Sequence, residues 1–333
     1  MTEIPRFTQR DVARAAGVSD MTVSRVMRGK GTVAAGTKAH VLQVVEEMGY
    51  VQNRLAGSLS ESRSNQIGVI IPSIVNSIFN QVTAGIAEEL EKAGYNPVIG
   101  VSNYDVEREE SLVESMMAWR PAGFVLTDLV HTRRTRNIMV NTGIPVVEIM
   151  ETGGRPIDMS VGFNHADSAR VMVEHLYGKG YRRFGYLGWY DTDFAASTRY
   201  RTIRDFLAEK GLPLVAPDVF RESPDIPTGK RALARLLQAH PQVEIVVFSN
   251  DAAATGGMMH CLEQGIAVPE ELAIAGFSGL RYGQALPRAL TTIRFHRFEI
   301  GRRAARAILN RLVGQDVPAV TDMGFDLIAG ESS

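Results

Sequence analysis

The chain has 333 residues, of which 45% are hydrophobic and 22% charged, and its formal net charge is −1. This balance is that of an ordinary globular protein and excludes a disordered or fibrous chain. No apolar run reaches the ~18 residues that span a bilayer, and the first residues lack the pattern of a secretory signal. We therefore expect a cytoplasmic protein without a membrane partner. The presence of a single cysteine, Cys261, agrees with a reducing compartment. Cys261 lies in a predicted helical stretch, where we expect it to be a small packing residue.

Charge is distributed unevenly along the chain. The first 63 residues hold nine Lys or Arg against six Asp or Glu, a net +3, which leaves −4 for the remainder. A basic head on an acidic body is what contact with a phosphate backbone needs. An excess this small is also typical of a solvated surface, so the charge by itself is weak support for DNA binding.

The first predicted elements are two short helices joined by a tight turn. Thr8 is a helix-capping residue, and the apolar residues that follow it over 9–16 recur at helical spacing. Gly17 interrupts this pattern, and Ser19 can cap a second helix over 20–28. This order predicts a helix-turn-helix, in which side chains near the start of the second helix reach base edges in the major groove.

A third helix is predicted over 37–48, where apolar residues would close a small core and Gly49 would end the helix. The alternative interpretation of these sixty residues is a three-helix bundle attached to an enzyme. It predicts no DNA binding.

From Ile67 onward the pattern changes to alternating strands and helices. Strands are predicted at 67–71, 97–99, 123–126, 144–147, 184–187, 245–248 and 272–277. Helix-length segments between them predict two parallel sheets and hence two lobes, with a ligand site at the carboxyl ends of the strands. Because no dinucleotide-binding glycine motif, metal-ligand spacing or nucleophile motif accompanies these strands, we expect no cofactor, no metal and no enzymatic activity.

Residues 11–26 and 49–56 resemble, almost position by position, the head of the LacI/GalR family of bacterial transcription regulators. The resemblance implies that Asp20 and Met21 choose operator bases, that Arg25 contacts a guanine edge, and that Thr22 and Ser24 lie nearer the phosphates. Residues 53–59 match the family's hinge helix, where Leu59 would enter the minor groove as a wedge. The residues expected at the DNA are Thr8, Ser19, Asp20, Met21, Thr22, Ser24, Arg25, Arg28, Asn53, Ala56 and Leu59.

The head departs from the family pattern at two positions. Gly57 weakens a hinge that must fold into helix by ~1 kcal/mol relative to alanine, and Ala34 replaces the usual serine cap of the third helix. Both changes predict a head that orders fully only on DNA.

The resemblance continues through 68–72, 76–79, 249–251, 276–277 and 290–293, which look like landmarks of the family's sensor domain. It implies an α/β fold: a helix-turn-helix head (1–51), a hinge helix and linker (52–66), and a periplasmic-binding-protein-like body (67–333). The lobes are expected at about 67–162 with 295–323, and about 163–294 with 324–333. A narrower likeness, over 144–151, 158–163, 276–279 and 324–327, is to the gluconate-utilisation repressors of the family.

Position and side-chain chemistry together indicate an effector site. Arg199 stands where the family has its effector arginine, and Asn250 would bond sugar hydroxyls while Asp251 holds its turn. Phe79 is either an apolar wall of the site or a core residue, and Arg297 is either a second cation in the site or a surface arginine. The residues expected at the effector are Ser73, Phe79, Glu148, Arg199, Asn250, Ser278 and Arg297.

Two departures in the body bear on the charge of the effector. Ser278 and Met150 stand where many family members carry an aspartate, so negative charge is removed from the cleft and an anionic ligand is favoured. Glu148 complicates this argument because it shares a strand face with Met150. It is either an acceptor for effector hydroxyls or a buried glutamate paired with an arginine.

These observations predict a homodimeric repressor, with a tetramer as the alternative. Two heads would bind a near-palindromic operator, and an effector such as gluconate would change the lobe angle, separate the hinges and release the DNA. The rival predictions are a cytoplasmic sugar-acid enzyme with an accessory DNA-binding head, and a binding protein for transport.

Overall fold

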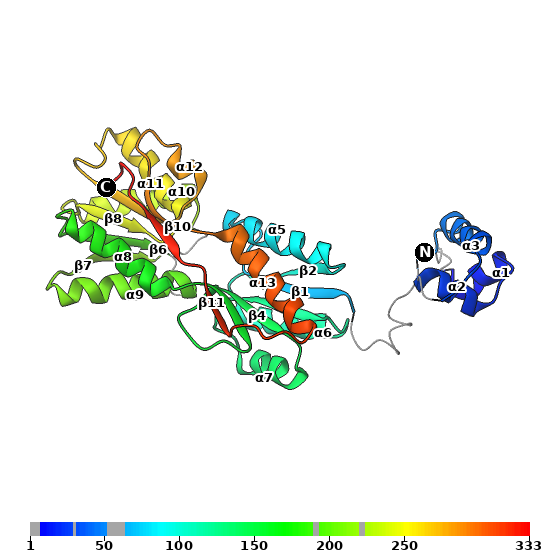
Figure 1. The fold of residues 1–333 in the computed structure, drawn as a ribbon. Helices are drawn as coiled ribbons and strands as arrows, with labels where there is room; N and C mark the ends of the chain where they lie inside the picture. The colour runs from blue at the N-terminus through cyan, green and yellow to red at the C-terminus, as the bar shows by residue number, and fades with distance from the viewer. Residues whose placement is uncertain (1–6, 29–30, 52–63, 189–192, 220–223) are drawn as a thin grey trace. The chain divides into compact units, whose positions relative to one another are not determined.

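A computed structural model describes residues 7–28, 31–51, 64–188, 193–219 and 224–333. The chain divides into two compact units, Met1–Arg63 and Ser64–Ser333 (Figure 1). We call them the head and the body and describe each by itself. Among the residues that the structure describes, every helix is too short or too polar to span a bilayer.

The head consists of α1 (Gln9–Ala15), α2 (Asp20–Arg28) and α3 (Ala35–Glu47). Thr8 and Asp11 cap α1 reciprocally, since the Asp11 carboxylate accepts the Thr8 N–H at 2.8 Å and the Thr8 hydroxyl accepts the Asp11 N–H. The Oγ of Ser19 accepts the N–H of Thr22 at the start of α2. The helices bury a small valine-rich core. The helix-turn-helix prediction is confirmed, and Ala34 caps α3 without a side-chain hydrogen bond.

The body contains two sheets. The first joins β1 (Gln66–Ile71), β2 (Asn96–Val101), β3 (Gly123–Thr127), β4 (Val146–Glu151), β5 (Met159–Phe163) and β11 (Val320–Asp322). Its strand order is β11-β5-β4-β3-β1-β2, and all neighbours pair in parallel.

The second sheet joins β6 (Phe184–Gly188), β7 (Leu214–Val219), β8 (Ile245–Phe248), β9 (Ala273–Ser278), β10 (Thr291–Phe295) and β12 (Phe325–Ile328). Its order is β12-β10-β9-β8-β6-β7. Two parallel sheets were expected, which is correct except that β12 runs antiparallel to β10. The sequence pattern also missed β5, β7, β10, β11 and β12, because these strands are short or carry polar residues.

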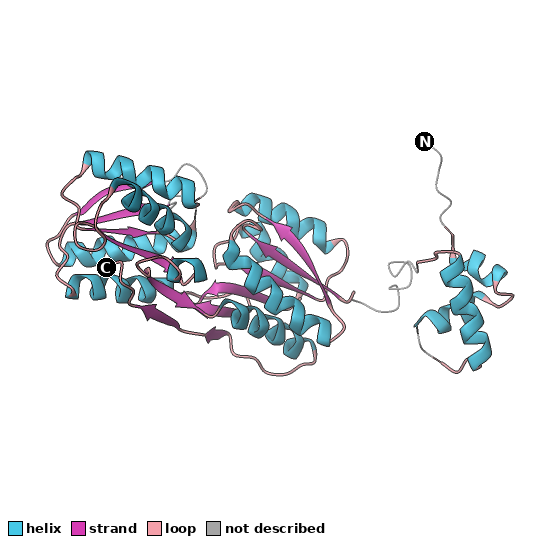
Figure 2. Ribbon diagram, turned by 90° about the horizontal axis from the view of Figure 1, so that it is seen from above, coloured by secondary structure: helices cyan, strands magenta, loops and turns pink. Residues whose placement is uncertain are grey.

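Helices cover both faces of each sheet (Figure 2). In the first lobe, α5 (Ser77–Lys92) and α13 (Arg297–Leu312) pack on one face, and α6 (Val106–Met117) and α7 (Arg133–Thr142) on the other. In the second lobe, α8 (His165–Gly178) and α9 (Phe194–Glu209) lie opposite α10 (Ile226–Ala239) and α11 (Asp251–Gln264). The short helix α12 (Arg281–Gln284) follows β9. Burial on both faces explains the continuous apolar runs of the central strands.

The chain passes between the lobes after β5, after β10 and between β11 and β12. A phenylalanine from each passage joins one aromatic cluster. Phe163 stacks on Phe295 with ring centroids 4.6 Å apart, and Phe325 meets the edge of Phe163 at 6.2 Å. These rings therefore tie together the segments that connect the lobes.

Glycines allow helix pairs to approach closely in both lobes. A Cβ on Gly301 of α13 would lie 2.0 Å from the carbonyl oxygen of Val82 on α5, and one on Gly85 would lie 2.1 Å from that of Phe298. The pair α10 and α11 repeats this arrangement with Gly229 and Gly256.

We therefore expect Gly301→Ala to force α5 and α13 apart and to destabilise the body by about 1–3 kcal/mol. Chemical unfolding of the full chain measures this effect. Gly178→Ala, at the end of α8 with open space around the added methyl group, is the matched control and should be neutral or slightly stabilising. Equal stability of the Gly301 variant and the unsubstituted chain would contradict the steric argument.

Candidate effector cleft and DNA-reading helix

The predicted base readers lie on the solvent face of α2. Asp20, Met21 and Arg25 are exposed, Met21 by 63%, while Thr22 and Ser24 are half-buried beside them. Thr8 and Ser19 are exposed at the starts of α1 and α2. Arg28 is the last residue of α2, and Asn53, Ala56 and Leu59 lie outside the described residues. The head thus presents a short polar helix face of the kind that enters a major groove.

Two residues of α1 contact Asp20. The Arg10 guanidinium lies 3.4 Å from the Asp20 carboxylate, and Gln9 donates to the Asp20 carbonyl at 2.8 Å. Exposed ion pairs of this type stabilise a protein little, so the carboxylate can exchange its partner for a base edge.

In the body, ionisable side chains from both lobes meet at the carboxyl ends of the strands. Asp128 directly follows β3 and Glu151 ends β4 in the first lobe, while His165 begins α8 and Arg199 lies on α9 in the second. Asp193 caps α9 by accepting the N–H of Ala196 at 3.0 Å. The pKa of Asp128 responds to both Asp193 and Arg199, so these groups act on one another across the two lobes.

Arg199 is buried, and its guanidinium is oriented from several sides. One nitrogen donates to the carbonyl of Ser249 at 3.0 Å, another bonds Nδ1 of His165 at 3.1 Å, and the group lies over the ring of Phe277 at 5.0 Å. Its Nε–H is buried and finds no partner among the described residues. The arginine is therefore fixed in place with one donor open.

Three carboxylates surround this arginine. Burial raises the pKa of Asp128 to about 8, with further contributions from Asp193 and Glu151. Burial also raises the pKa of Asp193 and of Glu151, although Arg199 and backbone N–H groups act against it. The raised pKa favours the protonated form of Asp128 at neutral pH, and in that form the carboxyl group can donate a hydrogen bond. The charge argument made from Ser278 and Met150 was therefore incomplete, because it left out these three carboxyl groups.

Several predicted effector residues have structural partners of their own. Ser73, after β1, accepts the N–H groups of Val75 and Asn76 and holds that turn. Asn250 caps α11 and donates to the carbonyl of Pro224. Phe79 is buried in the core of the first lobe, which agrees with its alternative interpretation as a core residue. Their place at an effector stays a prediction.

Arg297 and Ser278 lie together at the junction of the lobes. Arg297 is 7% exposed, which argues against a surface arginine, and it donates to Gln81 of α5 at 3.0 Å and to the carbonyl of Ser278. A pocket of about 420 Å³ lies beside it, with Gly279 and Arg281 among its lining residues. Arg297 thus connects the two lobes next to open space.

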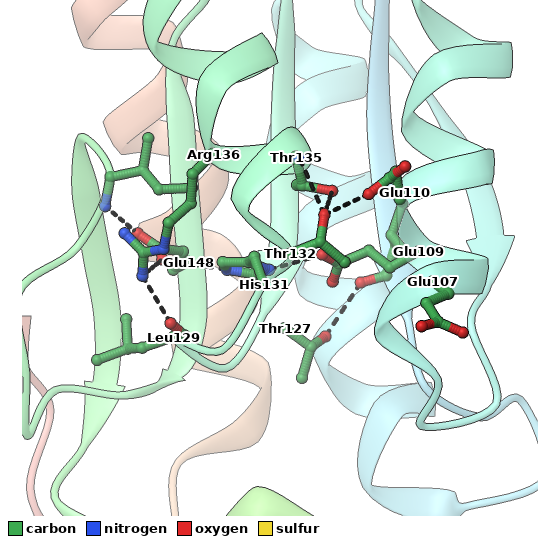
Figure 3. Close-up of polar contacts among 12 residues, drawn as sticks. Glu107, Glu109, Glu110, Thr127, Leu129, His131, Thr132, Thr135, Arg136 and Glu148 are labelled. Atoms are coloured by element: carbon green, nitrogen blue, oxygen red, sulfur yellow. Dashed lines mark hydrogen bonds and ion pairs between the residues drawn. The ribbon is translucent and has the colours of Figure 1, made fainter.

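Glu148 lies in a buried ionic network with His131 and Glu109 (Figure 3). Its carboxylate bonds Nε2 of His131 at 3.1 Å and accepts the N–H of Ile157, while the Arg136 guanidinium is 3.9 Å away. Nδ1 of His131 bonds Glu109 at 2.6 Å. The geometry favours the interpretation of Glu148 as a buried, paired glutamate. His131 lies nearer to its carboxylate than the predicted arginine partner does.

The contacts of the His131 ring favour a positive charge, because each of its nitrogens faces a carboxylate oxygen. Burial opposes this charge, but the hydrogen bonds with Glu109 and Glu148 outweigh it and raise the pKa of His131 to about 9. The network holds the loop between β3 and α7, which also carries Asp128. A small cavity of about 80 Å³ has Asp128, Glu109, Tyr104 and Phe194 in its wall.

The sequence pattern did not single out Asp128, Glu151, His165 or Asp193. Asp128 follows a predicted strand, and its position directly beyond that strand was the available signal. His165 follows β5, which was itself missed. Its role became visible only through its bond to Arg199.

This fold and these sites define a ligand-responsive, DNA-binding transcription regulator. Residues 8–53 match the family model described as bacterial regulatory proteins, lacI family, and residues 64–330 match periplasmic binding proteins and sugar binding domain of LacI family. The chain belongs to the LacI family. The resemblance stated from the sequence is thereby confirmed.

Similar proteins extend over nearly the whole chain. It is 32% identical over 323 residues to the HTH-type transcriptional regulator GntR of Escherichia coli K12, covering 97% of each protein. It is 33% identical over 329 residues to the regulator IdnR of the same strain, covering 98% of each. Members of this family bind operator DNA and small-molecule effectors.

Solved structures agree with this assignment. A LacI-family regulator from Silicibacter pomeroyi shares 37% identity and superposes with a TM-score of 0.93, covering 98% of this chain and 99% of that one. The Lac repressor dimer bound to operator and the anti-inducer ONPF, at 23% identity, 98% and 99% coverage and a TM-score of 0.81, shows the same fold.

Proposed function

We propose that this regulator is a homodimeric repressor of sugar-acid utilisation genes and that gluconate or a related sugar acid, bound between the lobes, releases it from its operator. Residues 1–51 would read the DNA, 52–66 would form the hinge, and 67–333 would bind the effector and dimerise. The cytoplasm, where operator DNA is accessible, is its proposed place of action.

The observation that carries the effector class is the combination of one fixed cation with carboxylates around it. Arg199 and the neutral His165 present donors that suit a carboxylate, while Asp193 and Glu151 are acceptors for hydroxyl groups. A sugar acid carries a single carboxylate and several hydroxyls. The relatives named GntR and IdnR, together with the narrower likeness of residues 144–151 and 276–279, support the same class.

Calorimetry with the full-length protein tests this proposal. Gluconate, related aldonates and their phosphates are the ligands, and glucose and glucitol are the neutral controls. We expect an aldonate to bind at least tenfold more tightly than either neutral compound. Absence of binding by every aldonate would refute the effector class.

The DNA-reading role of α2 gives a second expectation. Arg25→Ala should weaken binding to a duplex selected from a randomised library by about 1–3 kcal/mol, because a good bidentate contact to guanine discriminates by this amount. Fluorescence anisotropy measures the affinity. Lys38→Ala removes the same charge from an exposed position on α3 and is the control, for which we expect a much smaller loss. An equal loss in both variants would mean that Arg25 contributes only charge.

Leu59 stays the proposed minor-groove wedge. Full operator affinity in a Leu59→Ala variant would remove it from the mechanism.

A sugar-acid enzyme with an accessory head, the rival function, predicts turnover of gluconate by the body lacking residues 1–60. Our proposal predicts ligand binding without turnover by that fragment, and no DNA binding.

A further inference from the structure

His165 has the geometry of a ligand contact. Its ring is 2% exposed, and Nδ1 lies 3.1 Å from a guanidinium nitrogen of Arg199. Because arginine can only donate, Nδ1 must accept, and the ring proton then lies on Nε2. Burial and the neighbouring Arg199 lower the pKa of His165 well below its ordinary value, which agrees with a neutral ring.

The Nε2–H of this tautomer is an open donor. Nε2 of His165 and Nε of Arg199 are both buried and without a partner in the described part of the chain. Buried donors are normally satisfied, so each of these open donors points to an acceptor oxygen of a ligand. A sugar acid offers such oxygens, and those of its carboxylate are the strongest acceptors.

The surroundings hold the ring in one orientation. The edge of His165 packs against Phe163 with ring centroids 4.4 Å apart, and Phe163 is itself stacked on Phe295. The backbone N–H of His165 bonds the carboxylate of Glu151. Nε2 is therefore positioned before any ligand arrives, which favours selective binding.

Resting on the proposed function, we propose that His165 determines the specificity of the effector site: its Nε2–H donates to the carboxylate of the sugar acid. A neutral sugar offers only hydroxyl oxygens to this donor, and these accept a weaker hydrogen bond than a carboxylate does. The surrounding carboxylates then bind the polyol part of the ligand.

A pair of amide variants separates the two nitrogens of the ring. The side-chain amide of asparagine reaches about as far as Nδ1, so His165→Asn keeps an acceptor for Arg199 and loses the distal donor. Glutamine reaches about as far as Nε2, so His165→Gln keeps the distal donor. The probes are gluconate and its uncharged amide, gluconamide, titrated by calorimetry into the full-length protein.

We expect His165→Asn to weaken gluconate binding at least tenfold while gluconamide binding changes less than threefold, and His165→Gln to retain more gluconate affinity than the asparagine variant. Unchanged gluconate binding in His165→Asn, or equal losses for both ligands, would overturn the inference and leave the proposed function standing. If the unsubstituted protein binds no aldonate, the proposed function fails and this inference with it.

A measurement on the unsubstituted protein keeps the test independent of variant folding. Nitrogen-15 NMR of histidine-labelled protein reports which ring nitrogen is protonated. We expect the Nε2–H tautomer at neutral pH and a shift of its signal when gluconate is added. A proton on Nδ1, or a signal that gluconate leaves unchanged, would also overturn the inference.

Discussion

Replacing His131 with leucine is expected to lower the free energy of unfolding of the body by about 3–5 kcal/mol, because it leaves buried carboxylates without their cation. The ring is completely buried between Glu109 and Glu148, and leucine fills its space without replacing its charge. Arg136, 3.9 Å from Glu148, compensates only in part. Thermal unfolding of the full chain should show the midpoint of the body fall by roughly 6–20 °C.

The contribution of His131 should also depend on pH. Its pKa is raised to about 9 in the folded protein from about 6.5 when unfolded. The stabilisation is therefore complete below pH 6.5 and is lost as the pH rises through 9. The difference in stability between the unsubstituted chain and His131→Leu should shrink over this range. His260→Gln, at a half-buried histidine on α11, is the control and should give a small difference. A constant large difference for His131→Leu would show that packing, and not charge, explains the loss.

Replacing Arg199 with lysine is expected to abolish the response to effector while operator binding without effector persists. Lysine keeps the positive charge but lacks the planar fork that bonds His165 and the Ser249 carbonyl and leaves Nε–H open. Loss of a buried, hydrogen-bonded charge contact weakens binding by about 2 kcal/mol or more, which is about 30-fold. Calorimetry with gluconate and anisotropy with the selected duplex measure the two activities.

Arg201→Lys is the matched control for this experiment. Arg201 is exposed on the same helix, α9, and the substitution should leave both activities unchanged. Retained gluconate affinity in Arg199→Lys, with an intact fold, would remove this arginine from the site. Loss of DNA binding in the absence of effector would instead indicate damage to the fold.

The strong local patterns of the sequence were sufficient for most of the architecture. The capping residues and valine spacing of the head predicted α1 and α2, and continuous apolar runs predicted β1, β3, β8 and β9. These elements are marked by periodicity and composition within a few residues. Short edge strands such as β11 and β12 carry no such mark, since pairing with a distant strand creates them.

Some residues of the candidate effector site could likewise be predicted from the sequence, and others became visible only in the folded chain. The family resemblance of the sequence predicted Arg199 as an effector residue, and its role there stays a prediction. Only the tertiary structure decided that His165 faces Arg199, that Asp128, Glu151 and Asp193 surround the pair, and that Glu148 turns away to His131. These residues come from the ends of different strands and are far apart in the sequence. A hydrogen bond or a shifted pKa depends on their distance in space, which local sequence patterns do not give. The motifs of the sequence, above all the helix-turn-helix, therefore determined the class of the protein, and the folded chain decided which charged groups meet between its lobes.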